Sequence, residues 1–402
     1  MTNHAGGKRW VVWVLVGVAV AGALASAGAA DWPIYRGPAH NGISDETGWV
    51  SPQAELKVAW TVEMGKGCSA VSMVGDRVYT MGNDGSKDTV YCLDAATGKE
   101  VWKFSYDCPL APQMYEGGPN ATPTVDGGKV YTCSKKGQVY CFDAAKGDKV
   151  WEVQLKAKAP TWGYSGSFLP VGEMVILNAG PAGTALSKAD GKVVWESGTE
   201  PGGYSTPVPV KKGDATLVVL FSAKTTVAVN AADGKKAWEF PWVTSYDVNA
   251  ADPVVIDGGA KVFVSSGYNK GCALMDVSGE APKELWSNKK MRNKHTNSVF
   301  FKGAFYGFDE STATCLDAAS GEAKWTQNGF GEGSLMLADG KLIILAQSGK
   351  LIIADAAPEA FKEIASGQAV KGPCWTVPVL AGGKIYSRSK PGSLSCASFA
   401  GK

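Results

Sequence analysis

Short apolar runs alternate with polar turns along almost the whole chain after residue 57. The stretch TPTVDGGKVYTCSKKGQVYCFDAAKGDKVWEVQ, residues 122–154, shows the rhythm clearly. It contains four runs rich in β-branched and aromatic residues, and Gly, Asp or Lys stands at each break. Short alternating runs with turn residues between them are typical of antiparallel strands. The pattern predicts an all-β fold built from four-stranded units.

One motif, DAATGKEVW at residues 94–102, recurs along the chain. Its copies are DAAKGDKVW (143–151), SKADGKVVW (187–195), NAADGKKAW (230–238) and DAASGEAKW (317–325). A looser copy ends at Trp286 with three residues inserted after Gly279, and DAAPEAF (355–361) places Phe361 in the tryptophan slot. Asp can bond forward into a turn, and Gly supplies its positive φ. The motif therefore predicts a tight turn and an outer strand whose tryptophan packs on the neighbouring unit.

The spacing of the outer-strand aromatics predicts a closed ring. Eight such residues run from Trp60 to Phe361 with a period of about 43 residues, the length of a four-stranded propeller blade. The outer strand at Trp60 precedes any complete unit, whereas the last unit, residues 373–397, lacks one. We predict that Trp60 completes the last unit, which also hides two sheet edges. An open β-solenoid is the alternative.

We thus expect an eight-bladed β-propeller of four-stranded antiparallel blades over residues 58–402. Residues 31–57 form a turn-rich segment that we expect to pack on the propeller. The only helical turn expected lies within PEAFKEIASG, residues 358–367.

Residues 1–30 have the pattern of a secretory signal peptide. Lys8 and Arg9 precede an apolar run from Trp10 to Leu24, and small residues follow it. An uncleaved anchor is the alternative, although the run is short for a membrane span. We expect a periplasmic or secreted protein that meets the membrane only if this segment is retained.

The charge balance excludes nucleic acid as an expected partner. The chain has 40 Lys and Arg against 38 Asp and Glu, and removal of residues 1–30 takes away two cations and no acids. The remaining chain has a formal charge of zero and no basic stripe. We expect a monomer.

The nine cysteines are an odd number, so at least one is unpaired within the chain. Cys92, Cys141 and Cys315 stand at the same repeat position, two residues before the repeat Asp, which favours small buried side chains. The pairs close enough in sequence to be bridged are Cys133 with Cys141 and Cys374 with Cys396.

The repeat D-x-x-x-G-K-x-x-W resembles the pyrroloquinoline-quinone (PQQ) repeat. That repeat builds the eight-bladed propellers of quinoprotein dehydrogenases and of non-enzymatic relatives, including outer-membrane assembly propellers. The opening DWPIYRGPAHNGIS and the segments 329–361 and 374–396 look like those of exported PQQ-like propellers of planctomycete-type bacteria, which have no assigned reaction.

The family's enzymes use a vicinal Cys-Cys ring, a calcium ion held by Glu, Asn and Asp, and an Asp base. In this chain no two cysteines are adjacent, no Cys-x-x-Cys-His haem motif occurs, and only His40 and His295 remain after the signal segment. We therefore predict no cofactor and no metal. We favour a non-catalytic binding or scaffold protein over a PQQ- and calcium-dependent oxidoreductase, or another channel-based enzyme using Asp252, His295 or Glu332.

Residues that precede the inner strands of a propeller cluster at one mouth of its channel. The candidate ligand-binding residues there are Asn120, Trp162, Tyr164, Tyr204, Asn249, Asp252, His295, Asn297, Glu332 and Trp375. Their aromatic, amide and carboxylate groups suit an envelope protein, a peptide or a carbohydrate. Alternatively, they satisfy backbone groups at strand ends. Arg36 is expected to cap one channel face or to pair with an acid.

Overall fold

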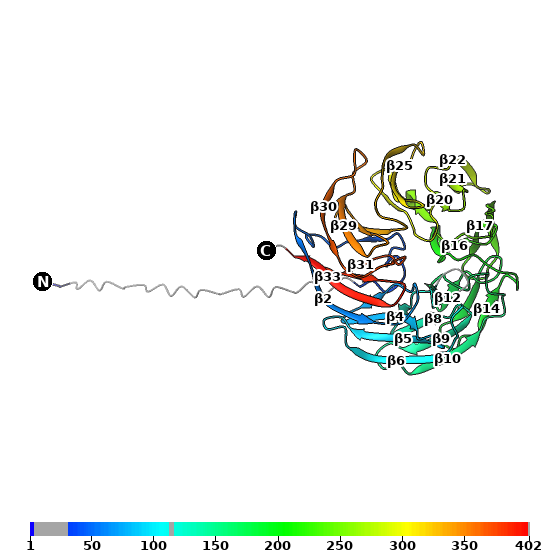
Figure 1. The fold of residues 1–402 in the computed structure, drawn as a ribbon, viewed down its shortest axis with the longest axis horizontal. Helices are drawn as coiled ribbons and strands as arrows, with labels where there is room; N and C mark the ends of the chain where they lie inside the picture. The colour runs from blue at the N-terminus through cyan, green and yellow to red at the C-terminus, as the bar shows by residue number, and fades with distance from the viewer. Residues whose placement is uncertain (4–30, 112–115, 401–402) are drawn as a thin grey trace.

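Eight four-stranded antiparallel sheets form a closed ring in the computed structural model, which describes residues 1–3, 31–111 and 116–400 (Figure 1). The predicted eight-bladed β-propeller is confirmed. Most of the expected signal segment, residues 4–30, lies outside the described residues. Within the described ranges no helix has the length and hydropathy of a membrane span.

The first four blades follow the chain from the innermost to the outermost strand. Blade 1 contains β3 (Ser72–Val74), β4 (Arg77–Asn83), β5 (Lys87–Asp94) and β6 (Glu100–Asp107). Blade 2 contains β7 (Thr124–Asp126), β8 (Lys129–Cys133), β9 (Gln138–Asp143) and β10 (Lys149–Gln154). Blade 3 contains β11 (Leu169–Val171), β12 (Met174–Leu177), β13 (Thr184–Ser187) and β14 (Val193–Glu196). Blade 4 contains β15 (Val208–Lys212), β16 (Ala215–Phe221), β17 (Thr225–Asn230) and β18 (Lys236–Pro241).

The next three blades repeat this order. Blade 5 contains β19 (Val254–Ile256), the 3-10 turn η1 (Asp257–Gly259), β20 (Lys261–Ser266), β21 (Gly271–Asp276) and β22 (Lys283–Asn288). Blade 6 contains β23 (Val299–Phe301), β24 (Ala304–Asp309), β25 (Thr312–Asp317) and β26 (Ala323–Gln327). Blade 7 contains β27 (Ser334–Ala338), β28 (Lys341–Leu345), β29 (Lys350–Asp355) and β30 (Glu363–Gln368), and β1 (Ile43–Ser44) adds in parallel to β27.

Blade 8 joins the two ends of the propeller, as predicted. It contains β31 (Val379–Ala381), β32 (Lys384–Arg388), β33 (Ser393–Ala400) and, as its outer strand, β2 (Glu55–Glu63). Trp60 lies opposite Cys396 in the β2–β33 ladder. Because β2 begins at Glu55, three residues assigned to the N-terminal segment belong to the closing strand.

The repeat turn locks each blade to the previous one. Trp102 of blade 1 donates its indole N–H to the carbonyl of Ala144 in blade 2 at 2.9 Å. Gly147 in that blade 2 turn has φ +77°, and a Cβ there would lie 2.6 Å from the Trp102 ring. Equivalent glycine–tryptophan contacts are Gly98–Trp60, Gly191–Trp151, Gly234–Trp195 and Gly321–Trp286. The repeat glycine is therefore required both by its backbone angle and by the ring that covers it.

The repeat cysteines are small side chains within the blades. Cys92 on β5 lies opposite Tyr79 on β4 and Trp102 on β6 and is fully buried. The same tyrosine–cysteine–tryptophan row recurs around Cys141, Cys315 and Cys396. All nine cysteines are free thiols in the structure, including the two pairs considered for bridging.

Two expectations for blade 7 are wrong. In the β29–β30 ladder, Ala365 takes the position that the tryptophan has in other blades, because it lies opposite Ile353 just after the register shift. Phe361 precedes β30 and packs edge-on against Trp325 of blade 6, with ring centres 5.5 Å apart. Residues 363–368 form a strand and not a helical turn, because the outer position of the blade needs a fourth strand.

The N-terminal segment crosses the face of the ring where the inner strands end. Trp32 bridges to Met73 in β3, and β1 pairs with Leu337 and Ala338 at the end of β27. The carboxylate of Glu46 accepts the backbone N–H groups of Gly382 and Gly383, just after β31. The segment is thereby fixed to blades 7, 8 and 1, which are neighbours in the ring.

Candidate functional site

A cavity of about 460 Å³ occupies the channel at the face where the inner strands begin. Its walls come from residues just before these strands in blades 1–6 and 8, and from Tyr35 of the N-terminal segment. Aromatic rings and hydroxyls make up much of the lining. A volume of this size is in the usual range for small-molecule sites in proteins.

A row of hydrogen bonds runs from blade to blade along the cavity wall. Each backbone N–H donates to a side-chain oxygen at the equivalent position of the next blade. The steps are Ala70 to Thr122 (3.1 Å), Thr122 to Ser167 (3.0 Å), Ser167 to Thr206 (3.0 Å), Thr206 to Asp252 (2.7 Å) and Asp252 to Asn297 (2.6 Å). We call these side chains the channel row. The alternative that polar residues here satisfy backbone groups is thus correct for part of the set.

Asp252 is the carboxylate of the channel row. Thr122 and Thr206 occupy the equivalent position in blades 2 and 4, and all three precede a proline. One carboxylate oxygen of Asp252, Oδ1, makes the bond that the threonine hydroxyls make. Its second oxygen, Oδ2, is buried and has no hydrogen-bond partner among the described residues. Burial raises the pKa of Asp252 to about 7, against the opposing effect of the Arg36 charge.

The floor of the cavity is supplied by the N-terminal segment. Tyr35 lines the cavity, and its hydroxyl accepts the amide of Asn297 at 3.0 Å. Arg36 is buried behind it and donates to the carbonyl oxygens of Asn41 and Ser298, each at 2.8 Å. No ion pair joins it to an acid within the described residues, so Arg36 caps the channel floor by bonding backbone, and its charge acts on Asp252 at longer range.

The wall formed by blades 6 and 8 is held by charges. Glu332 accepts Lys294 at 2.6 Å and lies 3.2 Å from the imidazole of His295. These contacts, with the His295 hydrogen bond as the largest cause, lower the pKa of Glu332 to about 2. His295 stacks on Trp375 with ring centres 4.3 Å apart, and Lys390 Nζ lies 3.4 Å from the centre of the same ring.

Trp375 therefore presents an edge to the cavity. An imidazole and an ammonium this close to one ring cannot share a face, so they occupy both faces. The indole Nε1–H of Trp375 is buried and has no hydrogen-bond partner among the described residues. Buried polar atoms without a partner are few in native proteins. Two such atoms, this N–H and Asp252 Oδ2, belong to residues that line the same cavity.

Four aromatic rings form a continuous rim over blades 3–5. Trp162 lies 6.1 Å from Tyr204 and 6.3 Å from Tyr246, and Tyr246 lies 5.8 Å from Tyr268, measured between ring centres. Tyr246 is 63% exposed, so the rim reaches the surface. We call these four residues the aromatic rim.

The structure brings six of the ten candidate residues to the cavity wall. They are Asn120, Trp162, Tyr204, Asp252, His295 and Trp375. Asn297 and Glu332 lie directly behind the wall and hold lining residues in place. Two candidates point elsewhere: Tyr164 donates its hydroxyl to Ala157 O in the core, and Asn249 bonds Ser222 O and Ser266 Oγ.

The remaining lining residues were not among the candidates. They include Tyr35, Tyr246, Tyr268, Lys294 and the channel-row residues Thr122, Ser167 and Thr206. Tyr246 and Tyr268 lie in loops of blades 4 and 5, away from the motif that guided the selection. The available signal was the concentration of aromatics in loops, where no core needs them.

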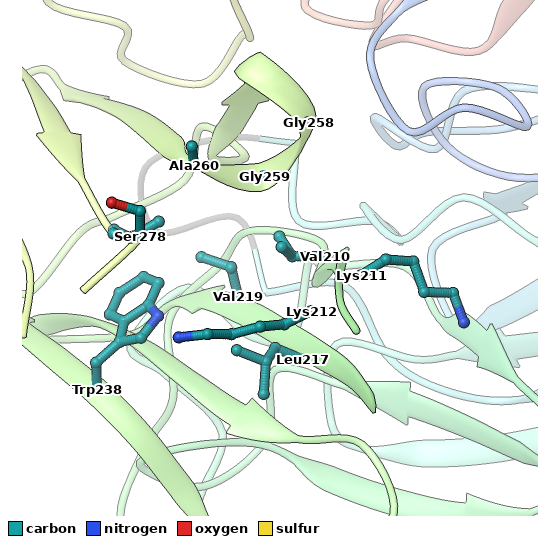
Figure 2. Close-up of a pocket in the computed structure, with 11 residues that line it drawn as sticks. Val210, Lys211, Lys212, Leu217, Val219, Trp238, Gly258, Gly259, Ala260 and Ser278 are labelled. Atoms are coloured by element: carbon teal, nitrogen blue, oxygen red, sulfur yellow. The ribbon is translucent and has the colours of Figure 1, made fainter. Parts of the chain in front are cut away.

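A second, smaller hollow of about 200 Å³ lies between blades 4 and 5 (Figure 2). Trp238 and Lys212 line it beside η1. The looser repeat copy has its insertion after Gly279, and this glycine does not contact the Trp238 ring in the way that Gly147 contacts Trp102. The hollow is a packing consequence of one irregular turn, and its lining in blades 4 and 5 lies apart from the channel row.

The lining does not fit the calcium–quinone arrangement of the family's enzymes. Within the described ranges no three His, Cys, Asp or Glu residues gather as a metal site. Asn297 Oδ1 and Asp252 Oδ1 already accept backbone N–H groups, and Glu332 is paired with cations. Among the described residues that line the cavity, Asp252 Oδ2 is the one carboxylate oxygen left uncommitted, whereas calcium takes six to eight oxygen ligands.

The fold and channel define an eight-bladed propeller of the quinoprotein type. A family model described as "Outer membrane protein assembly factor BamB" matches residues 44–154 and 86–327, and the chain belongs to this family. A curated relative of that name from Burkholderia pseudomallei (strain K96243) is 24% identical over 297 residues, which is 63% of this chain and 74% of the relative.

Solved structures with the same fold include a BamB and several dehydrogenases. BamB from Moraxella catarrhalis has a TM-score of 0.66 at 14% identity and covers 86% of this chain and 100% of its own. A europium-containing methanol dehydrogenase has 0.68 at 13%, covering 92% and 98%. Quinohemoprotein alcohol dehydrogenase from Comamonas testosteroni has 0.68 at 14%, covering 93% and 81%. At these identities the likeness concerns the fold alone.

Proposed function

We propose that this protein is a non-catalytic binding propeller of the cell envelope whose channel cavity holds a ligand. The observation that carries the proposal is a pair of buried, unpartnered polar atoms, Asp252 Oδ2 and Trp375 Nε1, on two residues that line one cavity with aromatic walls. An unpaired buried polar group costs about 1–3 kcal/mol, and a ligand that bonds both groups recovers this cost.

The family membership supports the placement in the envelope. The matching family and the curated relative carry the name of an outer membrane protein assembly factor. With the signal-like residues 1–30 removed, the propeller would act in the periplasm or outside the cell as a monomeric scaffold. An envelope protein, a peptide or a carbohydrate would bind at the channel mouth.

Binding at the cavity is tested by a ligand screen on the purified propeller. Peptides, sugars, organic acids and amines are added singly, and the melting temperature and tryptophan fluorescence are recorded. Trp162 and Trp375 line the cavity, so an occupant changes the emission of at least one of them. A ligand that raises the melting temperature and is unchanged after incubation supports the proposal. A screen without any ligand-dependent change contradicts it.

An enzyme is the second candidate, and one observation favours it. Asp252 lines the cavity with a pKa of about 7, which is the value that general acid–base catalysis requires near neutral pH. Addition of PQQ and calcium followed by dye reduction with alcohols or sugars tests this candidate. Reduction that depends on Asp252 would replace the binding proposal with an oxidoreductase.

A further inference from the structure

The chemistry of the cavity wall points to the class of ligand, an inference that rests on the proposed binding function. Three hydroxyls of the channel row, on Thr122, Ser167 and Thr206, line the cavity side by side in blades 2, 3 and 4. Each already accepts a backbone N–H from the preceding blade, at 3.0–3.1 Å. None donates its own proton to another group in the described part of the chain. A hydroxyl has one donor and two acceptor sites, so each retains its donor for an occupant.

The next member of the channel row supplies a hydrogen-bond acceptor. Asp252 in blade 5 follows these donors with its free Oδ2, which accepts a hydrogen bond when the carboxyl is ionised. Trp375, which also lines the cavity, has an unpartnered Nε1–H as a further donor. An occupant that satisfies the wall therefore carries several acceptor oxygens and at least one hydroxyl or amine donor.

The aromatic side chains favour an occupant with an apolar ring face. Tyr35 and the aromatic rim of Trp162, Tyr204, Tyr246 and Tyr268 line the same cavity as the hydroxyls. The C–H faces of a pyranose pack on such rings while its edge carries hydroxyls. A cavity of about 460 Å³ accommodates one or two sugar rings.

The charges around the cavity are already compensated. Lys294 is paired with Glu332 at 2.6 Å and Lys390 with Glu116 at 3.2 Å. Arg36 acts electrostatically on Asp252, which leaves no lining cation free to attract an anion. An anionic occupant would in addition face the Asp252 carboxylate, and a cationic one would face Arg36 behind the floor.

We propose that the channel cavity binds a neutral saccharide, with Asp252 accepting a sugar hydroxyl, the channel-row hydroxyls and Trp375 Nε1–H donating to sugar oxygens, and the aromatic rim stacking on a ring. The residue that decides this specificity is Asp252, because it is the one carboxylate among the side chains of the channel row.

The experiment titrates the full propeller with neutral sugars (glucose, galactose, mannose, N-acetylglucosamine and their disaccharides) against glucuronate and glucosamine, with calorimetry as the readout. We expect at least one neutral sugar to bind more than tenfold tighter than its charged counterpart. Asp252→Thr keeps the bond to Thr206 N, as in the equivalent threonines, but removes Oδ2. We expect it to weaken the sugar about tenfold or more.

A matched pair in blade 2 controls for packing. Thr122→Val removes a cavity hydroxyl, whereas Thr132→Val removes a buried hydroxyl that has no partner and does not line the cavity. We expect weaker sugar binding only for Thr122→Val. Preferential binding of a charged sugar or a peptide overturns the neutral saccharide and leaves the binding function intact. If no probe binds, both the saccharide proposal and the proposed binding function are overturned. If a sugar binds equally well to Asp252→Thr, the assignment of this site is overturned.

Discussion

The substitution Asp252→Thr should make the stability of the propeller less dependent on pH. Burial raises the pKa of Asp252 from its ordinary value of 3.8 to about 7 in the folded protein. The folded state therefore holds a proton between these values that the unfolded chain has released. The stability contributed by the protonated carboxyl is fully present below about pH 4 and is lost as the pH rises through 7.

The structure gives a magnitude for this loss. Asp252 is only 4% exposed, so solvent screening is small. Each unit of pKa displacement corresponds to about 1.4 kcal/mol, and between pH 5 and pH 8 the linkage amounts to roughly 2.5 kcal/mol. Threonine does not titrate and keeps the bond to Thr206 N, so the variant lacks this term.

Urea unfolding at pH 5, 6, 7 and 8, followed by tryptophan fluorescence, measures the effect. The free energy of unfolding of the wild type minus that of the variant should fall by roughly 2.5 kcal/mol from pH 5 to pH 8. Groups such as Glu332 contribute equally to both proteins and cancel. A difference that stays constant over this range would refute the conclusion that Asp252 is buried with a raised pKa.

Two further predictions concern the frame. Gly147→Ala should lower the free energy of unfolding by about 3 kcal/mol, because the new Cβ overlaps the Trp102 ring and the backbone is strained. Gly127→Ala, with φ +56° and nothing within 4 Å, should lower it by about 1 kcal/mol. Equal losses in chemical denaturation would contradict the interlocking role of the glycine. Glu46→Ala should lower the free energy of unfolding by about 1–2 kcal/mol, because the hydrogen bonds to the Gly382 turn are lost. It should also make residues 31–54 more susceptible to limited proteolysis. Unchanged cleavage would contradict the anchoring of that segment.

The ring was predictable from sequence because its construction repeats. Each of the five regular copies of the motif carries the glycine that the tryptophan of the preceding blade covers, so the turn at Gly147 is repeated in four others. The closing role of Trp60 followed from comparing the outer strands with the units: one outer strand precedes the first unit, and the last unit lacks one. Blade 7 escaped prediction because it lacks both motif glycine and tryptophan: Phe361 resembles the missing aromatic in sequence, but the ladder register gives that position to Ala365.

The cavity was predictable only in outline. The residues before each inner strand were expected at one channel mouth, and most candidates lie there. Asn249 and Asp252, three positions apart, illustrate the limit: one bonds backbone inside the blade and the other lines the cavity. Which way a loop side chain points depends on contacts between blades. The insertion of Tyr35 from the opposite face depends on a crossing segment without any repeat.

The indole N–H resonance of Trp375 tests the central claim most directly. In ¹⁵N-indole-labelled protein, with the signal assigned by Trp375→Phe, the propeller is titrated with the neutral sugar that binds best. A bound ligand that accepts from Nε1 should shift this resonance in step with saturation, and the same shift should need about tenfold more sugar in Asp252→Thr. Saturating binding that leaves the Trp375 resonance in place would contradict a ligand site in the channel cavity.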